Sequence, residues 1–353
     1  MTNKLRKVRI YTLNLRGVAV TYNFKSPPIK VFGVPNFYKT KKTVRLPDEL
    51  DEMLINKGLG KRCPGGRVCF RTDAPSFTVK VTLATNRTDA GMSIYAAQSL
   101  AVLIGDRKNP YFAGLVSPMN YDTLSFEKTV KKNTIDVKMD DVTIFFPRNE
   151  GVLDLEIEVD DTYTVEAPTP YLDIKPIVYY GSSITEGGCS ALSINAYNAI
   201  ISNHLNLDYY NLGFSGSARA ELPLADYIAD NFDMSIFVYD YDHNAPDVSF
   251  LKATHEPFFL RLREKCPTLP VIMMSRPLAV YPKNDARRAI IKATYENAKA
   301  RGDKNVYFID GESFFLGEDS YRCLVDTIHP NDYGFTLMAR VIEPVIKNIL
   351  DIE

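Results

Sequence analysis

The stretch that decides the fold is PIVYYGSSITEGG, at residues 176–188. An apolar, aromatic run ends there at a glycine, and two serines and further glycines follow at once. Near-continuous apolar strands are typical of parallel sheets covered by helices on both faces, and in such sheets functional groups collect just past the carboxyl ends of the strands. The stretch therefore predicts a buried strand followed by a turn, which is either an ordinary loop or the seat of a nucleophile.

From this stretch to the end of the chain, apolar runs alternate with helical patterns. Strand–helix alternation of this kind predicts an α/β domain with a parallel sheet. The expected strands are PIVYYG (176–181), DYYNLGF (208–214), DMSIFVYDYD (233–242), LPVIMMSRP (269–277) and KNVYFIDG (304–311).

The first part of the chain has a different pattern, with short β-rich runs separated by Gly, Pro, Asp and Asn. Several runs alternate apolar and polar residues with period two, which predicts an antiparallel sandwich or jelly roll. The runs include VRIYTLNL (8–15), MSIYAA (92–97) and TIDVKM (134–139). Three prolines in the stretch before residue 177 disfavour regular structure. We therefore expect an all-β domain at 1–165, a linker at 166–176 and the α/β domain at 177–353.

The composition limits the classes of partner. The chain has 353 residues, which suits two domains, and a formal net charge of −1, which argues against a nucleic-acid partner. No continuous apolar stretch is long enough for a membrane span, and the first residues lack the pattern of a secretory signal, so we expect a cytoplasmic protein that could oligomerise. Neither a metal motif nor a phosphate-binding motif is present, which predicts no cofactor. Five cysteines without a CxxC pair are expected to be reduced, packed thiols.

Polar clusters follow the expected strands of the α/β region. They are GSSITEGG (181–188), GFSGSA (213–218), DHNAP (242–246) and, before the last helix, DTIHPND (326–332). Because the carboxyl ends of parallel strands meet at one edge of a sheet, this edge could bring all four clusters together.

One of the four histidines has a neighbour that suits catalysis. His204 and His255 lie in helical patterns, where packing or a surface position is expected, whereas His329 has Asp326 three residues before it. A carboxylate at that spacing can orient the imidazole and stabilise its protonated form, as serine catalysis requires. The alternative is a plain turn before a helix, with Asn331 or Asp332 as the N-cap.

The other parts of a serine site are present in the same order. Serine catalysis needs a hydroxyl exposed on a sharp turn and fixed donors for an oxyanion, and GSSIT, Gly216 and Asn244 could supply them. No GxSxG elbow occurs in the chain, and glycine and asparagine also fill ordinary loops.

Together the four clusters resemble the successive blocks of the SGNH (GDSL-type) hydrolase superfamily, over roughly residues 177–350. The resemblance implies a flavodoxin-like αβα sandwich and hydrolysis of acyl esters. It makes Ser183 the nucleophile, His329 the base and Asp326 its orienting partner. The backbone of Ser183, together with Gly216 and Asn244, would form the oxyanion hole.

The sequence departs from the family pattern at several positions. Ser182 stands where many members carry Asp, and Asp242 and Ala245 replace the usual Gly and Asp around Asn244. Asp242 would oppose negative charge near an oxyanion, so we expect it to point away or to pair with a cation. The phrases also suggest a bacterial subgroup with an N-terminal β-domain that carries a GxDLY motif. Here GMSIY at 91–95 is the nearest match, with Ser93 in place of Asp.

The resemblance further implies a short-chain, above all acetyl, ester of a carbohydrate as substrate, a small molecule or an oligosaccharide. An acyltransferase with the same triad, a lysophospholipase or thioesterase, and a noncatalytic binding protein remain as alternatives. The β-domain could bind sugar or simply cover the cleft, although the chain has no Trp for a sugar platform.

Overall fold

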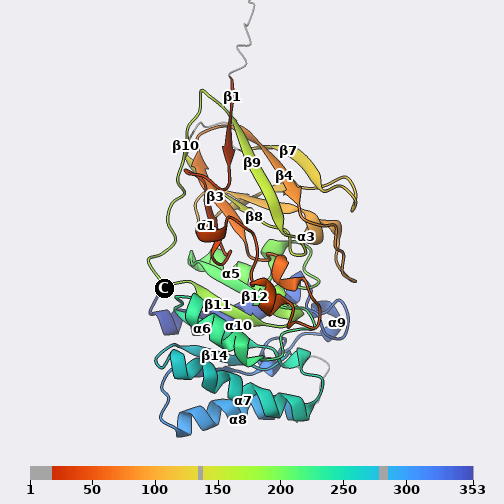
Figure 1. Cartoon of the computed structure of the whole chain (residues 1–353), viewed down its shortest axis with the longest axis vertical. Helices are drawn as coiled ribbons and strands as arrows, with labels where there is room; N and C mark the ends of the chain where they lie inside the picture. Colours follow the sequence, from red (N-terminus) through yellow and green to blue (C-terminus); the bar gives the residue numbers. More distant parts are fainter. Residues whose placement is uncertain (1–17, 134–137, 278–284, 353) are drawn as a thin grey trace, which may run out of the picture.

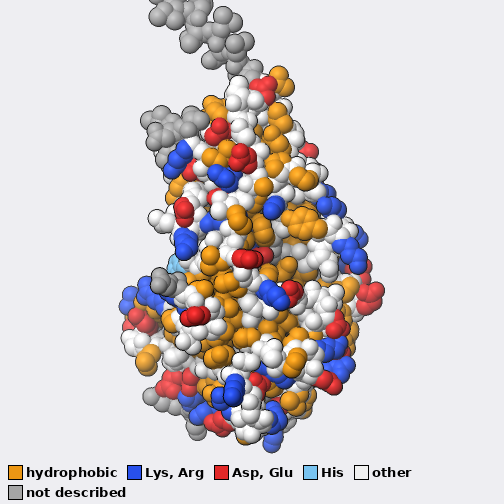
Figure 2. All heavy atoms as spheres, turned by 90° about the vertical axis from the view of Figure 1, so that its left-hand side faces the viewer, with side chains coloured by type: hydrophobic (Ala, Val, Ile, Leu, Met, Phe, Trp, Pro, Cys, Tyr) orange, Lys and Arg blue, Asp and Glu red, His pale blue; other side chains and the backbone are white. Residues whose placement is uncertain are grey.

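The computed structural model describes residues 18–133, 138–277 and 285–352, which form two parts stacked along the long axis of the molecule (Figure 1). Antiparallel sheets make up the upper part, called the β-domain below, and a helix-covered sheet makes up the lower part, called the α/β domain. On the face shown in Figure 2, acidic and basic side chains are interspersed.

The α/β domain is built on five parallel strands in the order β12-β11-β13-β14-β15. In chain order this is 2-1-3-4-5, the flavodoxin-like arrangement that the resemblance predicts. Five apolar runs supply the strands, as expected: β11 (Ile177–Gly181), β12 (Tyr209–Gly213), β13 (Ile236–Asp240), β14 (Val271–Met274) and β15 (Val306–Ile309).

Helices cover both faces of this sheet, which explains why its strands are apolar throughout. Val178 and Tyr180 of β11 belong to one hydrophobic core and Ile177 and Tyr179 to the other, because successive side chains of a strand point to opposite faces. The first core is closed by α6 (Leu222–Asn231), α7 (Val248–Lys265) and α8 (Ala286–Ala300), and the second by α5 (Tyr197–Leu205) and α10 (Asp332–Leu350).

The β-domain consists of two antiparallel sheets with a hydrophobic core of residues from both. One sheet has the order β1-β9-β4-β7, formed by β1 (Ala19–Asn23), β9 (Val152–Asp160), β4 (Ser76–Leu83) and β7 (Ser125–Lys131). The other has the order β10-β3-β8-β5-β6, with β2 added to β3, and is formed by β10 (Val165–Glu166), β3 (Arg67–Thr72), β8 (Asp140–Phe145), β5 (Leu100–Ile104), β6 (Tyr111–Val116) and β2 (Lys30–Phe32).

Short helices connect these elements. They are α1 (Phe37–Thr40), α2 (Asp48–Asp51), α3 (Ile94–Gln98), α4 (Ser183–Glu186) and α9 (Ser320–Cys323), with 3₁₀ turns η1 (Leu59–Lys61), η2 (Ser193–Asn195), η3 (Asp242–Asn244) and η4 (Gly311–Ser313). None of the helices in the described residues is both long and apolar enough to span a membrane.

One expected strand is a helix. The run MSIYAA at 92–97 contains the start of α3, because the Ser93 hydroxyl caps the helix by accepting a hydrogen bond from the Ala96 N–H at 3.4 Å. Aspartate is an equally good N-cap, so Ser93 preserves the capping role that the Asp of a GxDLY motif would have at this position. The run VRIYTLNL lies outside the described residues, as does most of TIDVKM.

The two domains are in extensive contact. Ala101, Leu103 and Phe145 of the β-domain belong to the same buried cluster as Tyr209 of β12. At the end of β12 farthest from the polar clusters, Arg67 forms an ion pair with Asp208. The β-domain is therefore packed along β12, the edge strand of the parallel sheet.

Candidate active site

The structure separates the roles of the two adjacent serines. Ser182 is the N-cap of α4 and is 1% exposed, and its hydroxyl accepts a hydrogen bond from the Ile184 N–H at 3.2 Å. Ser183 is the first residue of α4, directly after β11, and lines a cavity. The cap occupies the first hydroxyl, and the second is left facing the cavity.

A hydrogen-bonded chain joins Ser183 to a histidine and a carboxylate. The Ser183 Oγ lies 2.7 Å from the His329 Nε2, and the His329 Nδ1 lies 2.8 Å from the Asp326 Oδ2. A carboxylate can only accept, so Nδ1 carries the proton and Nε2 is free to accept the serine proton. The structure thus brings together the three residues that the spacing and the resemblance selected.

Asp326 is held by its own turn. Its Oδ1 accepts the backbone N–H groups of Ile328 and His329, both at 2.7 Å. Partial burial works to raise the pKa of Asp326, but these hydrogen bonds and the one from the imidazole outweigh it and lower the pKa below its usual range. Asn331 caps the following helix, so the helix-start alternative and the Asp–His pair are both present.

The two expected oxyanion donors line the same cavity as Ser183. Gly216 follows β12 with a φ of 67°, in the left-handed region that favours glycine, and Asn244 is the last residue of η3. One N–H of the Asn244 amide donates to the Phe214 carbonyl at 3.0 Å, which leaves its second N–H for another acceptor. Both residues line the cavity with Ser183 and His329.

Two buried carboxyl groups, Asp240 and Asp242, lie at the end of β13 and in η3, in the segment that leads to Asn244. Burial, together with the neighbouring Asp242, raises the pKa of Asp240 to about 7, although the Thr185 hydroxyl donates to it. Burial also raises the pKa of Asp242 to about 6, against the backbone N–H and charge of Arg276 and the charge of Arg287. Asp242 is fully buried beside cations, and it is absent from the cavity wall, as expected.

The cavity has a volume of about 590 Å³ and lies between the two domains. Its α/β wall contains Ser183, Gly188, Cys189, Ser215, Gly216, His243, Asn244, Ile328 and His329. Its β-domain wall contains Asn56, Leu59, Arg62, Asp89, Ala90, Met92 and Arg148. The structure therefore corrects the expectation of a packed thiol at Cys189, which is half-buried at the cavity. The five cysteines are free.

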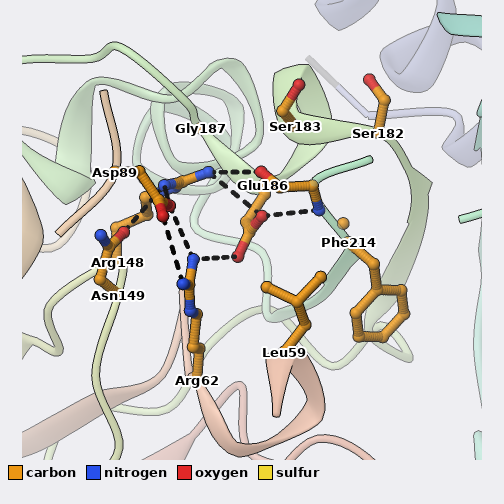
Figure 3. A network of polar contacts seen from close by, with 12 residues as sticks. Leu59, Arg62, Asp89, Arg148, Asn149, Ser182, Ser183, Glu186, Gly187 and Phe214 are labelled. Carbon is orange, nitrogen blue, oxygen red and sulfur yellow. Dashed lines mark hydrogen bonds and ion pairs between the residues drawn. The ribbon is translucent and has the colours of Figure 1, made fainter. Parts of the chain in front are cut away.

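Three charged side chains of the β-domain wall, Arg62, Asp89 and Arg148, belong to one polar network (Figure 3). Asp89 accepts hydrogen bonds from Arg62 at 2.7 Å and from Arg148 at 2.6 Å. Arg148 also donates to Glu186 of α4 at 3.1 Å and to the Ser215 Oγ at 2.7 Å. Glu186 is fully buried, so the guanidinium of Arg148 neutralises a charge that would otherwise be strongly destabilising.

A third arginine of the β-domain, Arg45, completes this network. It lies 3.6 Å from Glu186 and is itself completely buried. Burial lowers the pKa of Arg45 to about 10, even though Glu186 favours its charged form. The three guanidinium groups and the two carboxylates tie the β-domain to the helix that carries Ser183.

Sequence reasoning missed this wall. Its one signal is the run RNE at 148–150, in which three polar residues stand between apolar runs, and these three residues are buried.

His243 was also missed as a cavity residue, and burial lowers its pKa to about 3, so it is neutral at ordinary pH. In the described part of the chain, no cluster of His, Cys, Asp and Glu side chains could hold a metal ion.

Family models match both domains. Residues 174–347 match the GDSL-like lipase/acylhydrolase family, and residues 21–165 match the N-terminal domain of SGNH-hydrolase-type esterases named GxDLY. No curated protein matches the chain.

Solved structures share the whole two-domain fold. A GDSL-like lipase from Bacteroides ovatus is 24% identical with a TM-score of 0.82, over 95% of this chain and 99% of that one. The salicylyl-acyltransferase SsfX3 of a tetracycline biosynthetic pathway is 19% identical with a TM-score of 0.75, over 95% and 99%. A family two carbohydrate esterase from Clostridium thermocellum, in complex with cellohexaose, is 15% identical with a TM-score of 0.61, over 82% and 93%.

At these identities the solved structures establish the fold, and the two family models establish the class. The chain therefore belongs to the GDSL-like lipase/acylhydrolase family, as a carboxylic ester hydrolase with a GxDLY-type N-terminal domain.

Proposed function

We propose that the protein is a serine esterase that removes short-chain acyl groups, acetyl above all, from carbohydrate esters. The observation that carries the proposal is the continuous chain from Ser183 through His329 to Asp326, which opens into a cavity with a charged opposite wall. The first part of that observation supports the chemistry and the second supports the substrate.

The chemistry follows from the hydrogen bonds of the site. The His329 Nε2 takes the proton of Ser183 while the Ser183 Oγ forms a bond to the ester carbonyl carbon. The resulting oxyanion is stabilised by the N–H groups of Ser183 and Gly216 and by the amide of Asn244. The protonated imidazole, stabilised by Asp326, gives its proton to the departing alcohol, and an acyl-enzyme remains. Water then attacks the acyl group as the same imidazole takes its proton, and the imidazole gives that proton to the Ser183 Oγ as the acid leaves.

The wall opposite the nucleophile supports a hydroxyl-rich alcohol. Asp89 is one-third exposed and can accept hydrogen bonds from sugar hydroxyls, while the guanidinium of Arg62 can donate to them. The cavity also contains Leu59, Met92 and Ile328, which suit a short acyl group, so the comparison of acetyl with longer acyl esters tests the chain length directly.

An acyltransferase would use the same first half-reaction and deliver the acyl group to an alcohol. The structural likeness to a salicylyl-acyltransferase makes this the second candidate. Hydrolase and transferase differ only in the acceptor, so products formed in the presence of acceptor sugars separate them.

A screen of O-acetylated oligosaccharides, read out as released acetate, tests the proposal. We expect acetate release from at least one of them, and faster hydrolysis of 4-nitrophenyl acetate than of the octanoate. The Ser183→Ala protein is the blank for every substrate. Failure with every acetylated carbohydrate, together with rapid hydrolysis of acyl-CoA or lysophospholipid, would overturn the carbohydrate assignment.

A further inference from the structure

The loop at 213–217, called the oxyanion loop below, carries Gly216 and is held by side chains of the other domain. The Asn56 side-chain amide of the β-domain donates to the Ser215 carbonyl at 2.8 Å. The Asn56 backbone N–H donates to the Ser217 Oγ at 2.9 Å. Asn56, which is distant in sequence, thus forms hydrogen bonds with the residues on both sides of Gly216.

The first of these hydrogen bonds determines where a catalytic donor points. The Ser215 carbonyl and the Gly216 N–H belong to one peptide unit, which is planar and trans, so the two groups point in opposite directions. Holding the carbonyl against Asn56 therefore fixes the direction of the Gly216 N–H. Oxyanion stabilisation depends on this direction, because a donor that must reorient during the reaction loses much of its effect.

Other side chains hold the rest of the oxyanion loop. The Ser215 N–H donates to Glu186 at 2.9 Å, and the Ser215 Oγ accepts from Arg148 at 2.7 Å. At the start of the loop, Arg45 donates to the Gly213 carbonyl at 2.6 Å and stacks on the Phe214 ring at 4.5 Å. These contacts fix the ends of the loop, and the Asn56 amide fixes the peptide between them that bears the donor.

We propose that Asn56 is a positioning residue for the oxyanion hole, and that the β-domain thereby controls the chemical step. The proposal rests on the proposed esterase function, since it needs Gly216 to stabilise an oxyanion. Asn56 acts through the Ser215–Gly216 peptide, so it affects the transition state more than the bound substrate.

The position of Asn56 makes the proposal testable without disturbing a core. Asn56 is exposed and lies in the segment between α2 and η1, and its exposed neighbour Lys57 pairs with Glu52 at 2.6 Å. Asn56→Ala removes the hydrogen bond to the Ser215 carbonyl. Lys57→Ala removes an exposed charge pair from the same segment and is the matched control.

Steady-state kinetics of the full-length chain on 4-nitrophenyl acetate provide the first measurement. We expect Asn56→Ala to lower kcat about tenfold, less than complete loss of an oxyanion donor, with KM changed less than twofold. Lys57→Ala should keep the kcat of the parent. Asn56→Gln, which retains an amide on a longer side chain, should recover part of the loss.

Inhibition by methylboronic acid, which forms a tetrahedral adduct with a catalytic serine, provides the second measurement. Its inhibition constant should rise by the same factor as kcat falls, which a general loss of folded protein would not cause. An Asn56→Ala protein with the parent kcat, or with a change in KM alone, would refute the proposal. A Ser183→Ala protein as active as the parent would instead refute the esterase function on which the proposal depends.

Discussion

The two walls of the cavity are built in different ways. On the α/β wall, Asp326 and His329 are held by one short turn at the sheet edge, with hydrogen bonds between residues two or three apart. On the β-domain wall, Arg148 reaches partners 59, 38 and 67 residues away in the sequence. Each reacting group lies in a short motif within one domain, and the fold of that domain brings Ser183 and His329 together, whereas the surface that faces them depends on the packing of two domains.

This difference suggests a division of work between the walls. The α/β wall is expected to carry the bond-making steps, and the β-domain wall to contact the alcohol part of the ester and to hold the oxyanion loop. Substitution of the Ser183 nucleophile or of Asn56, which holds the oxyanion loop, should therefore lower kcat, whereas substitution of Asp89 on the β-domain wall should mainly raise KM for the carbohydrate ester.

The largest expected effect lies on the α/β wall. Ser183→Ala should lower kcat on 4-nitrophenyl acetate by about 10⁵-fold, because no other group can form the acyl-enzyme. Ser182→Ala is the matched control. It removes a helix cap and should lower the free energy of unfolding by about 1 kcal/mol while most of the activity remains. Activity in the Ser183→Ala protein above a hundredth of the parent would place the nucleophile elsewhere.

A smaller and more selective effect is expected on the β-domain wall. Asp89→Asn keeps the shape of the side chain but removes its charge, and a charged acceptor contributes more than a neutral one to binding a hydroxyl. We expect KM for an acetylated oligosaccharide to rise about tenfold, as for the loss of one charge-assisted hydrogen bond. The rate on 4-nitrophenyl acetate should stay within threefold. Equal losses on the two substrates would show that Asp89 serves the chemical step rather than substrate binding, and would contradict its assigned role.

The smallest expected effect is on the pH dependence of the free energy of unfolding, through the buried carboxyl group of Asp240 at the end of β13. The pKa of Asp240 is raised to about 7, so the folded protein keeps this proton at pH values where the unfolded chain, near pH 4, has already lost it. The wild type therefore loses stability from this group as pH rises from about 4 to 7. Asp240→Asn abolishes that loss, so the stability of the variant relative to the wild type should increase with pH, by about 1.4 kcal/mol per pH unit for one carboxyl group. The charge of Asp242 interacts with Asp240, so removal of the Asp240 charge also favours ionisation of Asp242, which adds to the difference in the same sense.

Urea unfolding of both proteins at several pH values between 5 and 8 measures this difference. The imidazoles of His243, at the cavity, and of His255, in the core, have pKa values lowered to about 3 by loss of solvation. They affect stability in the opposite sense, but they are present in both proteins and cancel. A difference that stays constant with pH would mean that Asp240 is ionised in the folded protein throughout this range.

Much of the α/β domain could be predicted because its signals are local. Apolar runs such as IVYYG can only be buried between two helical layers, and the polar clusters after them must then meet at one edge. The β-domain was harder to predict. In MSIYAA the capping serine outweighs the strand-like pattern, because a satisfied helix start is decided by one hydrogen bond that periodicity does not report.

The residues of the site also differ in whether the sequence could indicate them. The sequence singled out Ser183, Gly216, Asn244, Asp326 and His329 through the order of the four clusters and their resemblance to the SGNH blocks, whereas each short motif alone also fits an ordinary turn. Only the tertiary structure could show that Ser182 is a buried cap, and that Arg62, Asp89 and Arg148 face the nucleophile.

The physical reason is the range of the interactions involved. Turns, caps and strand ends depend on neighbours within a few residues, and the chain encodes them directly. The contacts between Asn56 and Ser215, or between Arg148 and Glu186, form only when the two domains are packed together, and no spacing in the sequence specifies them.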